Sequence, residues 1–196
     1  MSNKPTLVAA TGNAHKLKEL SHIFGHLYTV VSMKELGFDQ DIDENAETFA
    51  GNAAIKAETV SAALNLPVIA DDSGLAVDAL NGAPGVYSAR YCGHHGDDAA
   101  NNALLLQNMA NITNRAAAFH CAIALKLPGR DTLIAEGICP GVILHAEQGN
   151  GGFGYDPLFL YEPLNKTFAQ LTEEEKNAVS HRARASEKML ALMESL

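Results

Sequence analysis

The sequence has no tryptophan, only three cysteines and too few basic side chains to balance its acids. It carries 14 lysine and arginine residues against 23 aspartate and glutamate residues, for a net charge of −9. Nucleic-acid binding needs a broad basic surface, so this balance argues against a nucleic-acid partner. It does not exclude a small anionic substrate, because a bound cation and a few lysines can reverse the local field.

The sequence also lacks long apolar runs. No segment approaches the roughly 20 apolar residues that a membrane-spanning helix requires, so we expect no membrane partner. The first residues lack the apolar core of a signal peptide, and we expect a cytoplasmic protein. Cys92, Cys121 and Cys139 are odd in number and form no C-x-x-C pair. This pattern is typical of reduced thiols rather than of a disulfide framework.

The composition is that of an ordinary folded α/β domain. The 196 residues are 47% hydrophobic and 19% charged, which is enough for one sizeable core. We predict a single domain over 1–196, with a second, β-rich lobe at approximately 112–160. The apolar spacing predicts strands at 6–10 and 28–31, helices beginning at 14 and covering 48–63 and 97–111, and an antiparallel meander of three runs at 116–127, 133–138 and 142–145.

Two adjacent acids follow a short apolar run at 67–70. We expect that run to be a buried strand, with Asp71 and Asp72 at its carboxyl end and a Ser-Gly turn after them. Ligands in open α/β sheets bind beyond the carboxyl ends of strands. Two neighbouring carboxylates in a packed site need a compensating cation or proton, and Mg²⁺ prefers carboxylate oxygens. A solvated turn is the alternative reading.

A strand, turn and helix opens the chain, with Thr11, Gly12 and Asn13 at the turn. A helix N-terminus presents free N–H groups, and a glycine lets a ligand approach the backbone closely, so this turn suits a phosphate. Lys16 lies in the first helical turn and could reach the same anion. Simple capping by Thr11 or Asn13 explains the turn equally well.

A glycine-rich segment at 148–157 contains two aromatic side chains, Phe153 and Tyr155. These rings could stack on a planar base, and Asp156 could hold a sugar or a base edge. Near the C-terminus, His181 and Arg182 offer donors for a carbonyl oxygen. The alternatives are a flexible hairpin loop in the first case and a surface arginine in the second.

Six short sequence strings, taken in this order along the chain, resemble those of the Ham1-type inosine/xanthosine triphosphate pyrophosphatases. The resemblance extends over nearly the whole length of the chain. The strings are Thr11-Gly12-Asn13-x-x-Lys16, Glu44…Asn52…Lys56, Ala70-Asp71-Asp72-Ser73-Gly74-Leu75, Gly82-Ala83-Pro84-Gly85-Val86-Tyr87-Ser88-Ala89-Arg90-Tyr91, Gly151-Gly152-Phe153-Gly154-Tyr155-Asp156-Pro157 and Lys176-x-x-x-Ser180-His181-Arg182.

The resemblance implies an elongated two-lobed α/β fold with a central mixed β-sheet flanked by helices, a nucleotide cleft between the lobes, and a homodimer. It implies that a purine nucleoside triphosphate (ITP, dITP or XTP) is hydrolysed to the monophosphate plus pyrophosphate, with Mg²⁺ as cofactor. It places Mg²⁺ on Glu44 and Asp72, and Asp72 also orients or deprotonates the attacking water. The substrate-binding residues it implies are Thr11, Gly12, Asn13, Ala14, His15, Lys16, Lys56, Ser73, Phe153, Gly154, Tyr155, Asp156, Lys176, His181 and Arg182.

Two other functions remain open at this stage. A Maf-type nucleotide pyrophosphatase shares a similar scaffold and acts on pyrimidine or methylated nucleotides, but the glycine-rich string and the Ser-His-Arg string argue against it. A regulatory module that binds nucleotides without hydrolysis is the second alternative, and the Asp71-Asp72 pair together with the set of lysines argues against it. A 6-keto acceptor on hypoxanthine or xanthine matches a pocket lined by donors, whereas the 6-amino group of adenine leaves such donors unpaired.

Overall fold

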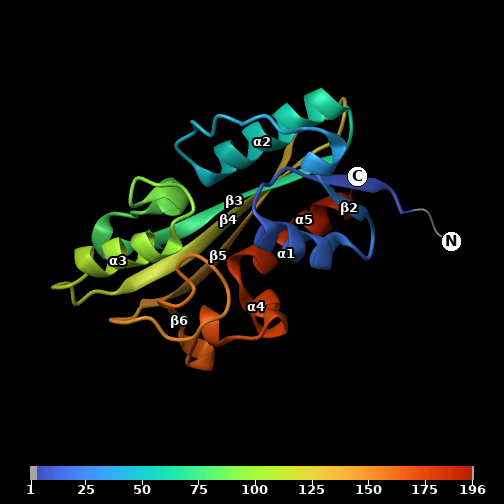
Figure 1. The fold of residues 1–196 in the computed structure, drawn as a ribbon. Coiled ribbons are helices and arrows are strands. Elements are labelled where there is room, and N and C mark those ends of the chain that lie inside the picture. The colour runs from blue at the N-terminus through green and yellow to red at the C-terminus, as the bar shows by residue number, and fades with distance from the viewer. Residues whose placement is uncertain (1–3, 196) are drawn as a thin grey trace. The chain divides into compact units, whose positions relative to one another are not determined.

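The computed structural model describes residues 4–195 and contains a seven-stranded sheet with the strand order β2-β1-β3-β4-β5-β6-β7. Strands β2, β1 and β3 are parallel, whereas β5, β6 and β7 are antiparallel, so the sheet is mixed. This confirms the predicted α/β class with helices flanking a mixed sheet (Figure 1). The strands are β1 Thr6–Ala9, β2 Thr29–Ser32, β3 Val68–Val77, β4 Ala116–Lys126, β5 Leu133–Ile143, β6 Phe159–Tyr161 and β7 Lys166–Thr167.

Five α-helices accompany these strands in the described part of the chain. They are α1 Ala14–Phe24, α2 Phe49–Leu64, α3 Asp98–Asn108, α4 Glu173–Val179 and α5 His181–Glu194. No helix among residues 4–195 is long and apolar enough to cross a membrane. The chain forms two compact units: unit 1 comprises 4–72, 121–137 and 182–195, and unit 2 comprises 73–120 and 138–181.

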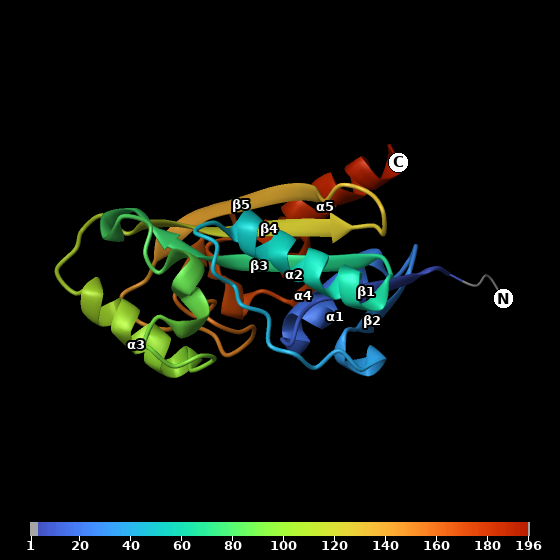
Figure 2. The ribbon, with the colours of Figure 1, turned by 90° about the horizontal axis from the view of Figure 1, so that it is seen from above.

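Unit 1 has apolar cores on both faces of its strands. Alternate residues of a strand point to opposite faces. Leu7 and Ile69 therefore pack with α1 and α5, while Val8 and Val68 pack with α2. Figures 1 and 2 show this layering, with α2 on one side of the strands and α1 and α5 on the other.

Unit 2 has a single core, which is rich in aromatic rings. Phe119 of β4 lies 4.6 Å from Phe159 of β6 and stacks 5.6 Å from Phe168, measured between ring centroids. Leu105 of α3 packs into the same cluster. Helix α3 begins where the sequence predicts, because the side chain of Asp97 caps it by accepting from the Ala100 N–H.

The structure corrects the prediction that a strand ends just before the paired acids. β3 continues through Asp71 and Asp72 to Val77, so both acids lie inside a buried strand rather than in a turn. The Ser73-Gly74 pair is part of the strand as well. Neighbouring strand residues point to opposite faces, so each carboxylate meets a different set of side chains.

The predicted meander of three runs is also wrong, because the last two runs form one strand. β5 extends from Leu133 to Ile143 and includes Pro140 and Gly141, which the sequence reading had taken as a break. Pairing between Ile143 and Phe159 of β6 continues the sheet beyond that dipeptide. The exposed Pro140 is tolerated within it.

Candidate active site

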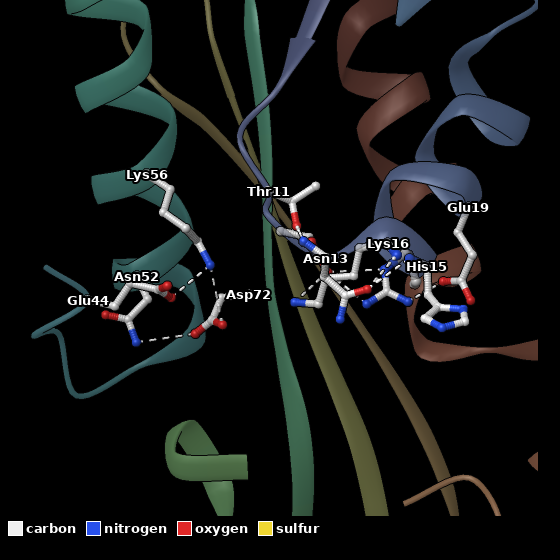
Figure 3. A network of polar contacts seen from close by, with 11 residues as sticks. Thr11, Asn13, His15, Lys16, Glu19, Glu44, Asn52, Lys56 and Asp72 are labelled. Atoms are coloured by element: carbon white, nitrogen blue, oxygen red, sulfur yellow. Dashed lines mark hydrogen bonds and ion pairs between the residues drawn. The ribbon is translucent and has the colours of Figure 1, made fainter. Parts of the chain in front are cut away.

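Two carboxylates from distant parts of unit 1 converge on one lysine. The Lys56 Nζ lies 2.8 Å from Glu44 Oε2 and 3.6 Å from Asp72 Oδ1. Figure 3 shows Lys56 descending from α2 between Glu44, on the preceding loop, and Asp72, on β3. The Lys56 and Asp72 side chains are 11% and 12% exposed, and that of Glu44 is 34% exposed, so the group is partly open to solvent.

Asn52 completes this group from one turn earlier in α2. Its amide donates to Asp72 Oδ2 at 3.2 Å, and its carbonyl oxygen accepts from the Ala46 N–H at 2.9 Å. It therefore links the acid on β3 to the loop that carries Glu44. No role was predicted for Asn52 from the sequence, although Asn52 and Lys56 are four residues apart and therefore lie on one face of the helix.

The charges of this group influence one another strongly. Burial raises the pKa of Asp72 above its ordinary value, and the Glu44 carboxylate raises it further, while Lys56 only partly offsets this. Burial lowers the pKa of Lys56, but Asp72 and Glu44 outweigh it, so that pKa lies above its ordinary value. At neutral pH the site therefore combines a firmly protonated lysine with a carboxylate whose charge burial disfavours.

Asp71 lies on the opposite face of the same strand and meets different cations. Its Oδ2 lies 2.8 Å from Arg182 Nη2 and 3.3 Å from Lys16 Nζ. Arg182 also pairs with Glu19 of α1, a residue that the sequence analysis missed. Burial would raise the pKa of Asp71, but Lys16 and Arg182 hold it well below its usual range. This acid is thus a buried, fully charged partner of two cations.

The turn before α1 is organised by capping, which was one of its two predicted roles. Asn13 Oδ1 accepts from the N–H groups of His15 and Lys16 at 2.9 and 3.2 Å. Thr11 Oγ1 accepts from the Asn13 N–H at 3.1 Å, and Figure 3 shows these side chains at the start of the helix. A Cβ built on Gly12 would meet nothing within 4 Å, so the fold itself does not require a glycine there.

The oxygen donors in unit 1 fit a hard divalent ion. Glu44 and Asp72 supply two carboxylates that already converge on one ammonium. No group of three or more histidine, cysteine or acidic side chains among residues 4–195 is arranged to hold a metal. Two carboxylates without an all-protein cage are typical of Mg²⁺ bound together with substrate phosphates.

The predicted base-binding segment lies in unit 2 and is held by ionic and ring contacts. Lys176 Nζ lies 2.6 Å from Asp156 Oδ2 and 4.7 Å from the centroid of the Phe153 ring. Asp156 Oδ2 also accepts from the Phe153 N–H at 2.9 Å. A Cβ on Gly152 would lie 2.1 Å from Asp156 Oδ2, which confirms that this glycine-rich backbone approaches another group closely.

Tyr155 and His181 are buried in unit 2. The Tyr155 hydroxyl donates to the Ser88 carbonyl at 2.8 Å, and its pKa is raised by burial. His181 is 4% exposed and stacks on Phe119 at 4.8 Å between centroids. Ser73, the first residue of unit 2, is half-buried in β3. Arg182, next to His181 in sequence, is part of unit 1, where it contacts Asp71 and Glu19. It is buried, so it is not a surface arginine.

Comparison with known proteins gives consistent matches over nearly the whole chain. The profile of the Ham1 family matches residues 7–192. A dITP/XTP pyrophosphatase of Geobacillus kaustophilus is 48% identical over 186 residues, covering 93% of this chain and 91% of that protein. The dITP/XTP pyrophosphatase of Bacillus subtilis is 46% identical and covers 96% of both chains. The structure of the Staphylococcus aureus Ham1 protein matches with a TM-score of 0.89 at 43% identity, covering 97% of this chain and 98% of that one.

Proposed function

Because the chain belongs to the Ham1 family, we propose that it hydrolyses deaminated purine nucleoside triphosphates, namely ITP, dITP and XTP, to the monophosphate and pyrophosphate. The single observation that carries the proposal is the convergence of Glu44 and Asp72 on Lys56 in unit 1. Cleavage of a triphosphate chain requires neutralisation of negative charge more than any other contribution.

Glu44 and Asp72 would hold Mg²⁺, which when bound neutralises charge on the phosphate oxygens. The chain's own cations act on the same substrate. Lys56 binds the phosphate chain, and Lys16 adds a second positive charge from the first turn of α1. The open space over Gly12 supports close approach of a phosphate to the turn backbone at 11–15.

Asp72 orients the attacking water and accepts its proton. Its position on β3 beside Glu44 and Lys56 supports this role, because the acid lies among the groups that hold the phosphate chain. The water attacks the α-phosphorus, the bond between the α-phosphorus and its bridging oxygen breaks, and pyrophosphate leaves. Asn52 holds the Asp72 carboxylate in place through its amide.

Recognition of the base is assigned to unit 2. Phe153 stacks on the purine, and Lys176 with Asp156 supplies a paired donor and acceptor beside it. His181, Arg182 and Ser73 remain proposed substrate contacts, and the burial of His181 and Arg182 supports roles that depend on fixed positions. Donors that face a 6-keto group favour hypoxanthine and xanthine over adenine.

The test is a nucleotide panel with orthophosphate and pyrophosphate measured separately, using ITP, dITP, XTP, ATP and GTP with and without Mg²⁺. We expect pyrophosphate from the first three nucleotides with Mg²⁺ present, and little from ATP or GTP. Orthophosphate as the main product, or equal turnover of ATP, would contradict the proposal.

We also propose that the protein is a homodimer, as the family resemblance implies. Several large apolar side chains are exposed in the described structure, and the most exposed is Tyr87 at 59%. Light scattering coupled to size-exclusion chromatography tests the oligomeric state directly. A single species at the mass of one chain would contradict a dimer.

A further inference from the structure

Within unit 2, helix α3 holds both backbone polar groups of a single residue in the glycine-rich segment. Asp98 Oδ2 accepts from the Gly154 N–H at 2.7 Å, and the Asn102 amide donates to the Gly154 carbonyl at 3.1 Å. The two side chains are four residues apart on α3 and so share one face of the helix. Gly154 is thus clamped by a donor and an acceptor from the same helix.

The Asn102 side chain has a fixed orientation, but its carbonyl oxygen is buried without a hydrogen-bond partner among the described residues. Its second amide hydrogen points to Glu147 Oε1 at 3.0 Å, so both donors of the amide face acceptors and its orientation is fixed. Asn102 is 4% exposed, and its Oδ1 has no hydrogen-bond partner among the described residues. A buried acceptor without a partner destabilises a fold, so packing alone does not explain an asparagine here.

Gly154 itself has a left-handed backbone with φ of +62°, and a Cβ on it would meet nothing within 4 Å. The glycine is therefore needed for its conformation and not for space. Glycine is the residue with the most conformational freedom, so a single conformation at this point needs external support. Asp98 and Asn102 supply that support on the N–H and C=O sides of this residue.

We propose that Asp98 and Asn102 are positioning residues that set base selectivity by fixing the backbone of Gly154. Gly154 lies directly after Phe153 and two residues before Asp156, so its conformation sets the ring plane and the carboxylate position. Misplacement of a recognition group by about 1 Å can cost on the order of 100-fold in rate. The inference rests on the proposed function, because it assigns the base contacts to this segment.

The test compares Asp98→Ala, Asp98→Asn and Asn102→Ala with a matched control, Asp97→Ala. Asp97 is the neighbouring acid and caps α3, so its removal loses the same charge and weakens the same helix without touching Gly154. The readouts are KM and kcat for ITP, the ratio of kcat/KM between ITP and ATP, and inhibition by pyrophosphate, which carries no base.

We expect Asp98→Ala and Asn102→Ala to raise the KM for ITP about five- to tenfold, which is typical of losing one such hydrogen bond. The ratio of kcat/KM for ITP to that for ATP should fall by a similar factor, with kcat and pyrophosphate inhibition within twofold of wild type. Asp98→Asn keeps an acceptor for the Gly154 N–H and should restore wild-type values. An effect of Asp97→Ala equal to that of Asp98→Ala, or a uniform loss that includes pyrophosphate binding, would overturn the proposal.

The rate of amide hydrogen exchange in the segment 150–158 measures how well Asp98 and Asn102 order the Gly154 backbone, and it needs no substrate. We expect faster exchange in Asp98→Ala than in Asp97→Ala, and an equal rate would overturn the clamp even if one variant proved too unstable for kinetics. Failure of the wild-type protein to cleave ITP would reject the proposed function instead. The exchange result would then still decide whether α3 orders Gly154.

Discussion

Replacement of Asp72 by asparagine separates the chemical role of this acid from its structural role. The substitution keeps the size of the side chain and an oxygen that can accept from Asn52, which now lies 3.2 Å away. It removes the charge that faces Lys56 at 3.6 Å, the proposed proton acceptor and one of two proposed Mg²⁺ ligands. We therefore expect binding of the nucleotide to survive and the chemical step to fail.

The magnitude follows from the electrostatic role. Removal of one group that stabilises the transition state typically costs about 2–4 kcal/mol of barrier, which is roughly 30- to 1,000-fold in kcat. Stability should move in the opposite direction. The pKa of Asp72 is raised, so in the absence of metal the folded protein binds this proton more tightly than the unfolded chain does. The charged form therefore lowers the stability of the free protein above that pKa, and the neutral asparagine should raise Tm.

The assay is pyrophosphate release from saturating ITP with Mg²⁺, paired with thermal unfolding in EDTA. Asp43→Asn is the matched control, because this exposed acid lies beside Glu44 on the same loop and its loss changes the net charge equally. A kcat for Asp72→Asn within twofold of wild type would refute the catalytic assignment. A fall in Tm of several degrees would refute the electrostatic reasoning.

Three further outcomes follow from the described contacts. Gly12→Ala should leave Tm unchanged, since its Cβ meets nothing, yet raise the KM for ITP severalfold by filling the space proposed for a phosphate; an unchanged KM would contradict this. Asp71→Asn should lower the unfolding free energy at pH 7 by about 3 kcal/mol, because the buried Arg182 loses one of its two carboxylate partners, Asp71, and retains Glu19. That loss should shrink in urea titrations below about pH 4, because the stabilisation from a lowered pKa disappears as pH falls through the folded value. Burial raises the pKa of Cys121 to about 12, so mass spectrometry after iodoacetamide treatment of the native protein should find labelling at the half-exposed Cys92 and not at Cys121.

Local signals in the sequence predicted the elements that depend on local chemistry. Helix α1 begins at Ala14 behind Asn13, and α2 begins at Phe49 behind Thr48, as capping residues and apolar spacing indicate. A place for Lys56 in one site with Glu44 and Asp72 was expected only from the family resemblance. Its four-residue spacing from Asn52 could have added the second polar contact.

The patterns in the sequence did not predict the long-range contacts. Arg182 reaches Asp71 across 111 residues of chain, and no periodicity in either segment indicates that pairing. The extent of β3 was misjudged because two acids and a Ser-Gly pair are typical of turns. Cations supplied from α1, α2 and α5 compensate those acids, and strand propensity is easily overridden by such tertiary contacts.

The alternation of a strand explains why two adjacent aspartates have opposite properties. Asp71 points to the face covered by α1 and α5, where two cations lower its pKa and its charge stabilises unit 1. Asp72 points to the face covered by α2, where burial and Glu44 raise its pKa despite Lys56. A buried charge that the fold compensates only in part favours a further cation, and Mg²⁺ with a triphosphate supplies one. One side of β3 therefore holds a structural acid and the other the acid that we propose acts in the chemistry, and the alternation of the strand keeps their surroundings separate.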